Sequence, residues 1–457
     1  MESVLRVVRS AIPGRLQWGS AAHLDDPGFY ARAGAFLVLA SILSGIALRL
    51  GGYVGGAYSW FVFSSASDDS WLPMGLAYAR VTGQSPGSLH DLFFVDHVKF
   101  QYPPSSLLLY SALDLIGIPP TQKALNALVW LSILATSGVV FRLCAVFVER
   151  HQRELRFSTS DKYLIAGAFG VATLFFYPIM ISWRLGQIQG LLNLMFAAAC
   201  LCWLSDRKLA AGALIGASCL IKPQFSLFLV WALLRREKTF AAGQAAVLAG
   251  GLALSLLLYG WANNVYYLEV LSYISGRGEI FWDNSSVNGF VNRILHPDET
   301  LIFKYHEFPP FHMATYVLTL ASSAIIVALA LFANRSPPAG SSLLDFMTAA
   351  LSFTLASPIA WGHHYGIAMP ILAATFLEIA RKTAGRRRRD YLIGWGICFL
   401  LFSNYWNVTE LLAGTFASPL QSWRLFAAIG LLWMMYRLNA PQTGARDGRT
   451  ALEAHAL

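Results

Sequence analysis

Charged residues are scarce in this sequence. Asp, Glu, Lys and Arg make up only 13% of the 457 residues, whereas soluble domains carry roughly 25%. Hydrophobic residues account for 56% of the chain, and its mean hydropathy is +0.51. The composition therefore excludes an ordinary water-soluble protein and predicts a polytopic membrane protein.

Cysteine and targeting signals are sparse as well. The five cysteines lie in apolar segments without metal-ligand spacing, so we interpret them as small buried hydrophobic residues rather than disulfides or ligands. Residues 1–20 lack the apolar core and cleavage site of a signal peptide. We expect a short basic arm there, with the first span acting as an uncleaved insertion signal.

Apolar runs of about 20 residues can cross a bilayer as helices. Ten such candidates lie at 33–50, 123–147, 163–180, 187–204, 240–260, 312–333, 342–360, 365–381, 391–408 and 420–437. Three shorter segments lie at 104–118, 209–221 and 224–234, and Lys222-Pro223 breaks the last two apart. With an odd number of spans, the two ends of the chain cannot both lie in the cytoplasm. Treating 104–118 as a re-entrant or interfacial helix gives about twelve spans; merging 209–234 is the alternative.

Basic residues indicate which side each loop faces. The formal charge of +9 comes from clusters that we assign to the cytoplasm rather than to nucleic-acid binding, because Lys and Arg gather in cytoplasmic loops. These clusters lie at 150–156, 206–208, 235–238, 334–335 and 381–389.

This assignment predicts the layout of an all-α membrane protein. A cytoplasmic basic arm covers 1–32, and a transmembrane domain of about twelve helices covers 33–438. Its long loops, 51–103 and 261–311, lie outside and carry short interfacial helices. The tail at 439–457 is polar, and we expect it to be cytoplasmic and disordered.

Two adjacent carboxylates, Asp68 and Asp69, follow the first span. Charges at a bilayer edge are costly unless they are solvated or used. Residues 69–83 then fit an amphipathic surface helix with Asp69 or Ser70 as its N-cap and Gly83 as its C-cap. Two interpretations stay open: a catalytic carboxylate, or two helix caps in a solvated loop.

Further polar residues fall on the same predicted outer side. Tyr102 precedes two prolines at the bilayer edge, Arg184, Gln187 and Asn193 open an otherwise apolar span, and Lys222 lies in the broken segment. Polar groups inside a membrane must find partners. Helix–helix hydrogen bonding, and snorkelling of Lys222, are the structural alternatives to a substrate site.

The long external loop is rich in hydrogen-bonding side chains, among them Asn284, Asn288 and Arg293. Such residues suit sugars, which present hydroxyl groups and an apolar ring face. Asn284 also begins an Asn-Ser-Ser glycosylation pattern, which is a weak signal.

Two adjacent histidines, His363 and His364, lie beside Trp361 and Tyr365 on the same side. Together with Arg184, Lys222 and Arg293 they form a candidate phosphate-binding site. A zinc site is the competing interpretation. It is disfavoured because adjacent histidines point apart on a helix and no third ligand has a fixed spacing.

Taken in order, these motifs form a specific set. An Asp stands fourteen residues before a Gly, an aromatic-x-Pro-Pro style segment follows, and Gly-Gln has an Asn six residues after the Gln. Ile-Lys-Pro, an external Asn-x-Ser with Asn-Arg, and Ser-Pro-x-x-Trp-x-His-His complete the series. Over roughly residues 33–380 this order resembles glycosyltransferase family 87, which includes polyprenol-phosphate-mannose-dependent α-(1,2)-mannosyltransferases of actinobacteria.

The resemblance implies a GT-C architecture, a polyprenyl-phosphate sugar donor and inversion at the anomeric carbon on the outer membrane face. It also implies that the Asp after the first span is the general base. The spacing to Gly83 selects Asp69, with Asp68 as the alternative. In the same family pattern, Ser285 stands where a Gln is usual.

The chemistry of sugar transfer from a lipid phosphate is consistent with these residues. An attacking sugar hydroxyl must lose its proton, which a nearby carboxylate can accept. Cations can stabilise the leaving phosphate without a metal or another cofactor, and the candidates are Lys222, Arg293, His363 and His364. The candidate substrate-binding residues are Tyr102, Arg184, Gln187, Asn193, Asn284 and Asn288.

We therefore predict a multi-pass glycosyltransferase of the plasma (inner) membrane with cytoplasmic termini and an extracytoplasmic active site. It would move a hexose, mannose by family default, to a lipid-linked or cell-envelope glycan, with membrane lipid and no nucleic acid as further partners. A transporter or flippase of lipid-linked sugars is the alternative, supported by the broken 209–234 segment. Polar residues gathered on one face argue against it, because transporters place them at the midplane.

Overall fold

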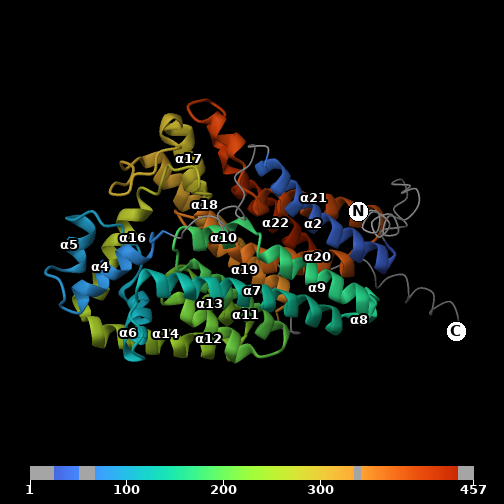
Figure 1. The fold of residues 1–457 in the computed structure, drawn as a ribbon, viewed down its shortest axis with the longest axis horizontal. Coiled ribbons are helices and arrows are strands. Elements are labelled where there is room, and N and C mark those ends of the chain that lie inside the picture. The colour runs from blue at the N-terminus through green and yellow to red at the C-terminus, as the bar shows by residue number, and fades with distance from the viewer. Residues whose placement is uncertain (1–24, 51–66, 334–340, 441–457) are drawn as a thin grey trace.

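The computed structural model describes residues 25–50, 67–333 and 341–440, which fold into a bundle of helices (Figure 1). This part of the chain contains no β-strand, and a single isolated bridge pairs Asn284 with Trp361. The all-α prediction is confirmed. The basic arm before residue 25, the stretch 51–66 and the tail after residue 440 lie outside the described residues.

Long and intermediate helices build the bundle. They are α2 (Pro27–Leu50), α7 (Gln122–Arg150), α9 (Thr159–Thr173), α10 (Tyr177–Arg184), α11 (Gln189–Leu204), α12 (Lys208–Cys219), α13 (Leu227–Arg235), α14 (Lys238–Tyr259), α18 (Met313–Phe332), α19 (Leu343–Leu355), α20 (Ala368–Lys382), α21 (Gly385–Ser403) and α22 (Trp423–Asn439).

Short helices occupy the connections. The α-helical ones are α4 (Trp71–Val81), α5 (Leu89–Phe94), α6 (Leu108–Leu115), α8 (Gln152–Leu155), α15 (Trp261–Val265), α16 (Tyr267–Ser275) and α17 (Val287–Leu295). The 3₁₀ turns are η2 (Pro104–Leu107), η3 (Pro223–Ser226), η4 (Pro297–Glu299), η5 (Gly362–Ile367), η6 (Asn407–Leu412) and η7 (Ser418–Ser422).

Proline sets two of the breaks between helices. The predicted interruption at Lys222-Pro223 is confirmed: Lys222 is extended, with φ −128° and ψ 94°, and separates α12 from η3 and α13. The predicted span 163–180 lies within the stretch Thr159–Arg184, which is long and apolar enough to cross a bilayer and consists of two successive helices, α9 and α10. Pro178 lies in the first turn of α10, where a missing backbone N–H costs least.

Hydropathy supports a membrane location. Among the described residues, four helical stretches are long and apolar enough to cross a bilayer: Gln122–Arg150, Thr159–Arg184, Lys238–Tyr259 and Met313–Phe332. On α14 and α18, large apolar side chains such as Leu257 and Ile325 are exposed, as expected for helices that face lipid. The total of about twelve spans stays a prediction.

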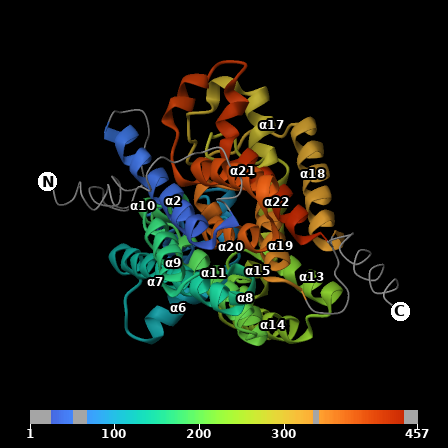
Figure 2. The ribbon, with the colours of Figure 1, turned by 90° about the vertical axis from the view of Figure 1, so that its right-hand side faces the viewer.

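The core lies around α19 and α20. Every residue of α19 is buried, and so is every residue of α20 from Ala368 to Ala380. Figure 2 shows α20 in the interior of the bundle, with α14 and α18 at its edges. Residues 356–367 join these two central helices, so the loop with the two histidines has a rigid support at both ends.

Ion pairs connect the basic loops at one end of the bundle, near α8 in Figure 1. They are Arg150–Asp206 (2.5 Å), Lys208–Glu237 (3.9 Å), Arg235–Asp345 (2.8 Å), Arg381–Glu154 (3.1 Å) and Arg388–Asp25 (3.0 Å). Helices α4 and α5 lie at the opposite end (Figure 1). The bundle therefore has one end rich in basic loops and another that carries Asp69.

Candidate functional site

The segment that carries Asp69 is docked on a second loop, residues 184–186. Three backbone hydrogen bonds join them: Ser67 N to Arg184 O (2.9 Å), Asp69 N to Leu185 O (2.9 Å) and Ser70 N to Gly186 O (3.1 Å). The position of the carboxylate is thus set by main-chain contacts between parts of the chain more than a hundred residues apart.

Gly186 permits this close approach. Its φ is +64°, a left-handed conformation that other residues adopt only with strain. A Cβ at this position would lie 1.9 Å from Ser67 O. Any side chain here would therefore push the two loops apart.

Side chains join the same loops. Gln187 donates from Nε2 to Asp69 Oδ2 (2.5 Å), and its Oε1 accepts from Ser70 Oγ (2.6 Å) and Tyr102 OH (3.2 Å). Ser70 Oγ also lies 2.9 Å from Tyr102 OH. The predicted site residues Asp69, Tyr102 and Gln187 are therefore brought together, and Ser70 is a fourth member.

Ser70, one of the two residues expected to cap the start of α4, has a different role. The helix does begin next to Ser70, but Ser70 makes no side-chain capping hydrogen bond. Its hydroxyl instead faces Gln187 and Tyr102, since these buried groups offer partners away from solvent. Spacing alone could not distinguish these two roles.

Asp69 is exposed to solvent, yet the surrounding protein desolvates its carboxylate and raises its pKa. The hydrogen bond from Gln187 opposes the rise, Asp68 adds to it, and the positive charge of Lys99 opposes it. Lys99 is itself paired with Glu279 at 2.5 Å. A carboxylate with a raised pKa is a stronger proton acceptor than an ordinary aspartate.

The second group of predicted site residues lies at η5. Lys222 and His363 are buried, and His364 is half-buried. Lys222 Nζ and the Nδ1 atoms of both histidines are buried without a hydrogen-bond partner in the protein. Burial lowers the pKa of both histidines well below the usual range, and the charge of Lys222 lowers it further.

A buried ammonium group without an acceptor is costly. Burial lowers the pKa of Lys222 well below its usual range, and an oxyanion beside it would favour the charged ammonium form. Lys222 and the two imidazoles could therefore hold an oxyanion, since they offer N–H donors in a dry environment. The side chain of Arg293, another predicted member, makes its hydrogen bonds outside this grouping.

Sequence reasoning missed an ion pair that fixes η5, the turn that carries His363 and His364 and is called the histidine turn below. Arg424 Nη1 lies 2.6 Å from Asp283 Oδ1, and Asp283 Oδ2 accepts from Gly362 N (3.0 Å), directly before His363. Both charged side chains are buried. The only sequence signal was an arginine within an apolar segment, which is rare in a membrane and marks a functional or structural contact.

Arg293 has a role inside the fold. Its Nη1 donates to Phe281 O and Trp282 O (both 3.3 Å), and its Nη2 donates to Asn284 O (3.0 Å) and Ser422 Oγ (2.6 Å). These contacts use its guanidinium to shape the loop that carries Asp283. We therefore give it a structural role in place of the predicted contact with phosphate.

Asn284 and Asn288 are also fully buried, within the predicted external loop 261–311. Asn284 donates to Glu279 O (3.0 Å) and accepts from Ala360 N (2.9 Å), while Asn288 donates to Thr319 Oγ1 (3.1 Å). Their amides hold loop segments together in the way that buried polar groups require. The Asn-Ser-Ser pattern is accordingly inaccessible in the folded protein.

The remaining two predicted residues, Arg184 and Asn193, each contact one of the two groups. Arg184 contributes its backbone carbonyl to the docking of Ser67. Asn193 accepts a hydrogen bond from Gln189 (2.9 Å) and packs against Gly366, where an added Cβ would lie 2.1 Å from Asn193 Nδ2. The loop of residues 67–70, called the carboxylate loop below, and the histidine turn thus both pack against the segment formed by α10 and α11, at the same end of the bundle.

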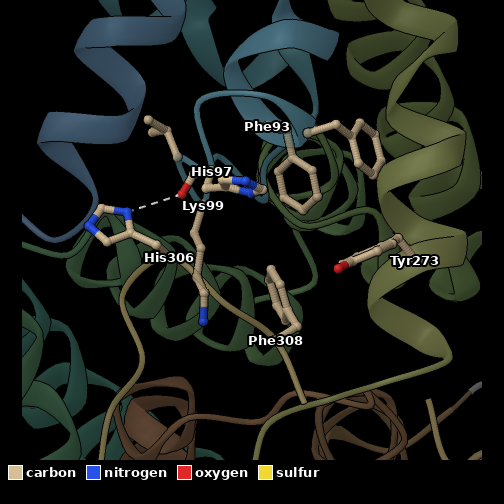
Figure 3. Close-up of a pocket in the computed structure, with 8 residues that line it drawn as sticks. Phe93, His97, Lys99, Tyr273, His306 and Phe308 are labelled. Carbon is tan, nitrogen blue, oxygen red and sulfur yellow. Dashed lines mark hydrogen bonds between the residues drawn. The ribbon is translucent and has the colours of Figure 1, made fainter. Parts of the chain in front are cut away.

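A pocket opens beside Lys99 (Figure 3). Its volume is about 50 Å³, and it is lined by Phe93, Phe94, His97, Val98, Lys99, Tyr273, His306 and Phe308. Within the described ranges, no three His, Cys, Asp or Glu residues form a group that could hold a metal ion. Metal independence stays a prediction.

Fold and site together define a class: an all-helical membrane protein with a carboxylate and a buried cation at one end of its bundle. The chain belongs to glycosyltransferase family 87, whose family model matches residues 100–358. This confirms the predicted family, which is one of glycosyltransferases.

Curated relatives are mycobacterial. The polyprenol-phosphate-mannose-dependent alpha-(1-2)-phosphatidylinositol pentamannoside mannosyltransferase of Mycobacterium tuberculosis is 25% identical over 319 residues, covering 68% of this chain and 66% of that protein. Polyprenol-phosphate-mannose-dependent alpha-(1-2)-phosphatidylinositol mannoside mannosyltransferases of M. tuberculosis and Mycolicibacterium smegmatis are 21% and 22% identical, with 74% of each chain covered. The aligned part thus spans just under two thirds of the first relative.

Docking of the carboxylate loop can be tested at Gly186. We expect Gly186→Ala to leave the protein folded but to lower glycosyl transfer at least tenfold, because the new Cβ displaces Ser67 and with it Asp69. Gly83→Ala is the matched control, since Gly83 also has a positive φ (+73°) but open space around it. Equal activities of the two variants would show that docking does not matter.

Proposed function

We propose that this chain transfers a hexose, mannose by analogy with the named relatives, from a polyprenyl-phosphate donor to a glycan or glycolipid acceptor. The reaction inverts the anomeric carbon, needs no metal, and takes place at the extracytoplasmic face of the plasma membrane. One observation carries the proposal: a solvent-accessible carboxylate with a raised pKa and a buried, unpartnered lysine occupy the same end of an apolar bundle.

Asp69 acts as the general base. The acceptor hydroxyl gives its proton to the Asp69 carboxylate while its oxygen forms a bond to the anomeric carbon. The bond from that carbon to the phosphate oxygen breaks, and polyprenyl phosphate leaves with the electron pair. Gln187 holds the carboxylate in place, because its amide donates to Oδ2 while Ser70 and Tyr102 fix its own carbonyl.

Lys222, His363 and His364 bind the donor phosphate. Supporting this, Lys222 Nζ has no protein acceptor, and the neutral imidazoles can each donate one hydrogen bond. A phosphate would supply the counter-charge that a buried ammonium group needs and would favour its protonated form. The Asp283–Arg424 pair keeps the histidine turn in position through Gly362.

Charge distribution supports the choice of face. The connected basic loops lie at the end away from Asp69 (Figure 1), and excess basic residues mark cytoplasmic loops. The same distribution argues against a flippase, because the polar side chains of the site gather at one end rather than at the middle of the bundle.

The proposal is tested by transfer of radiolabelled mannose from polyprenyl-phosphate-mannose by purified protein. We expect transfer, with kcat/KM falling as the pH drops through the pKa of Asp69, since protonation removes the base. The midpoint should lie above that of an ordinary aspartate, because desolvation raises the pKa. Lipid flipping without any transfer would favour the transporter instead.

The proposed binding site for the donor phosphate is tested by His364→Ala. We expect kcat/KM for the donor to fall on the order of tenfold to a hundredfold, with KM for the acceptor nearly unchanged. His312→Ala is the control, because His312 is exposed outside both groups of site residues. A loss confined to acceptor use would remove His364 from the donor site.

A further inference from the structure

The pocket beside Lys99 combines apolar rings with polar groups. Phe93, Phe94, Tyr273 and Phe308 supply four aromatic rings, and Lys99 runs along one wall (Figure 3). Three separate parts of the external region, α5, α16 and the loop before α18, meet there. The rings of Phe94, Tyr273 and Phe308 are only half-buried, so part of each ring remains accessible.

This pocket lies next to the carboxylate loop. Lys99 is three residues before Tyr102, so at most about 11 Å of extended chain separates their Cα atoms. Tyr102 contacts Ser70, the neighbour of Asp69. Helix α16, which carries Tyr273, is attached to the same segment because Tyr267 OH donates to Gln101 O (3.3 Å).

Lys99, which lines the pocket, forms a buried ion pair with Glu279. The side chains of Lys99 and Glu279 are 9% and 5% exposed, and their charged atoms lie 2.5 Å apart. Lys99 Nζ also lies 4.2 Å from the centre of the Phe308 ring. The ion pair therefore holds the ammonium group of Lys99 at a fixed place beside the aromatic rings.

Sugar rings match these features. Their C–H faces carry slight positive charge and pack on aromatic faces, which carry negative charge. Their hydroxyl groups both donate to carboxylates and accept from ammonium groups. The pocket offers both kinds of contact, because its lining combines aromatic rings with the ammonium group of Lys99.

We propose that this pocket is an acceptor subsite, which binds the sugar ring next to the one whose hydroxyl Asp69 deprotonates. The inference rests on the proposed function and names its acceptor as a glycan of at least two sugars. The volume of about 50 Å³ is small beside the roughly 300–1,000 Å³ of pockets that enclose a whole ligand. The ring therefore lies across the mouth, stacked on the aromatic side chains, with one edge inserted toward Lys99.

The test compares octyl α-mannoside with octyl α-dimannoside as acceptors, using polyprenyl-phosphate-mannose as donor. Wild-type protein should prefer the dimannoside. Phe308→Ala should reduce that preference by about 3–10-fold, the size of one aromatic contact, with KM for the donor unchanged. Phe308→Tyr should restore it, since the ring is kept.

Phe311→Ala is the matched control, because Phe311 is exposed and lies outside the pocket. Tyr273→Leu removes a second ring and serves if Phe308→Ala does not fold, as judged by thermal unfolding in detergent. An unchanged preference in the folded pocket variants, or none in wild type, overturns the subsite. Absence of transfer to either acceptor by wild-type protein overturns the proposed function itself.

Discussion

The docking of residues 67–70 on residues 184–186 is the contact on which the site depends. Three main-chain hydrogen bonds and the Gln187–Asp69 contact place one carboxylate at a fixed point. A general base must lie within hydrogen-bond reach of the proton that it accepts. A flexible loop at a bilayer edge could not provide that precision, and here Gly186 allows two backbones to approach closely enough to do so.

The distribution of charged residues also contributes to building the site. Basic loops pair with carboxylates at one end of the bundle, while at the other end Lys222 is buried without a protein acceptor. Two buried arginines, Arg293 and Arg424, are instead used to build the loop and the histidine turn. The two arginines thus shape the site through their protein partners, while Lys222, whose Nζ has no protein acceptor, is suited to bind a ligand.

Local patterns predicted much of this arrangement. Hydropathy located most helices, Pro223 marked the break at Lys222, and the ordered motifs indicated the family. The sequence did not show that Ser70 faces Gln187, or that Arg424 reaches Asp283, because these contacts join segments more than a hundred residues apart. Asn284 and Arg293 looked like sugar ligands since residue type alone does not reveal whether a polar side chain is buried among backbone partners.

The role of Asp69 is tested most directly by single-turnover transfer with wild type, Asp69→Asn and Asp68→Asn. The carboxylate that Gln187 holds should be the base, so Asp69→Asn should slow transfer by about 10²–10⁴-fold. Asp68→Asn, whose side chain lacks that contact, should stay within a few-fold of wild type. Full activity in Asp69→Asn with loss in Asp68→Asn would contradict the account.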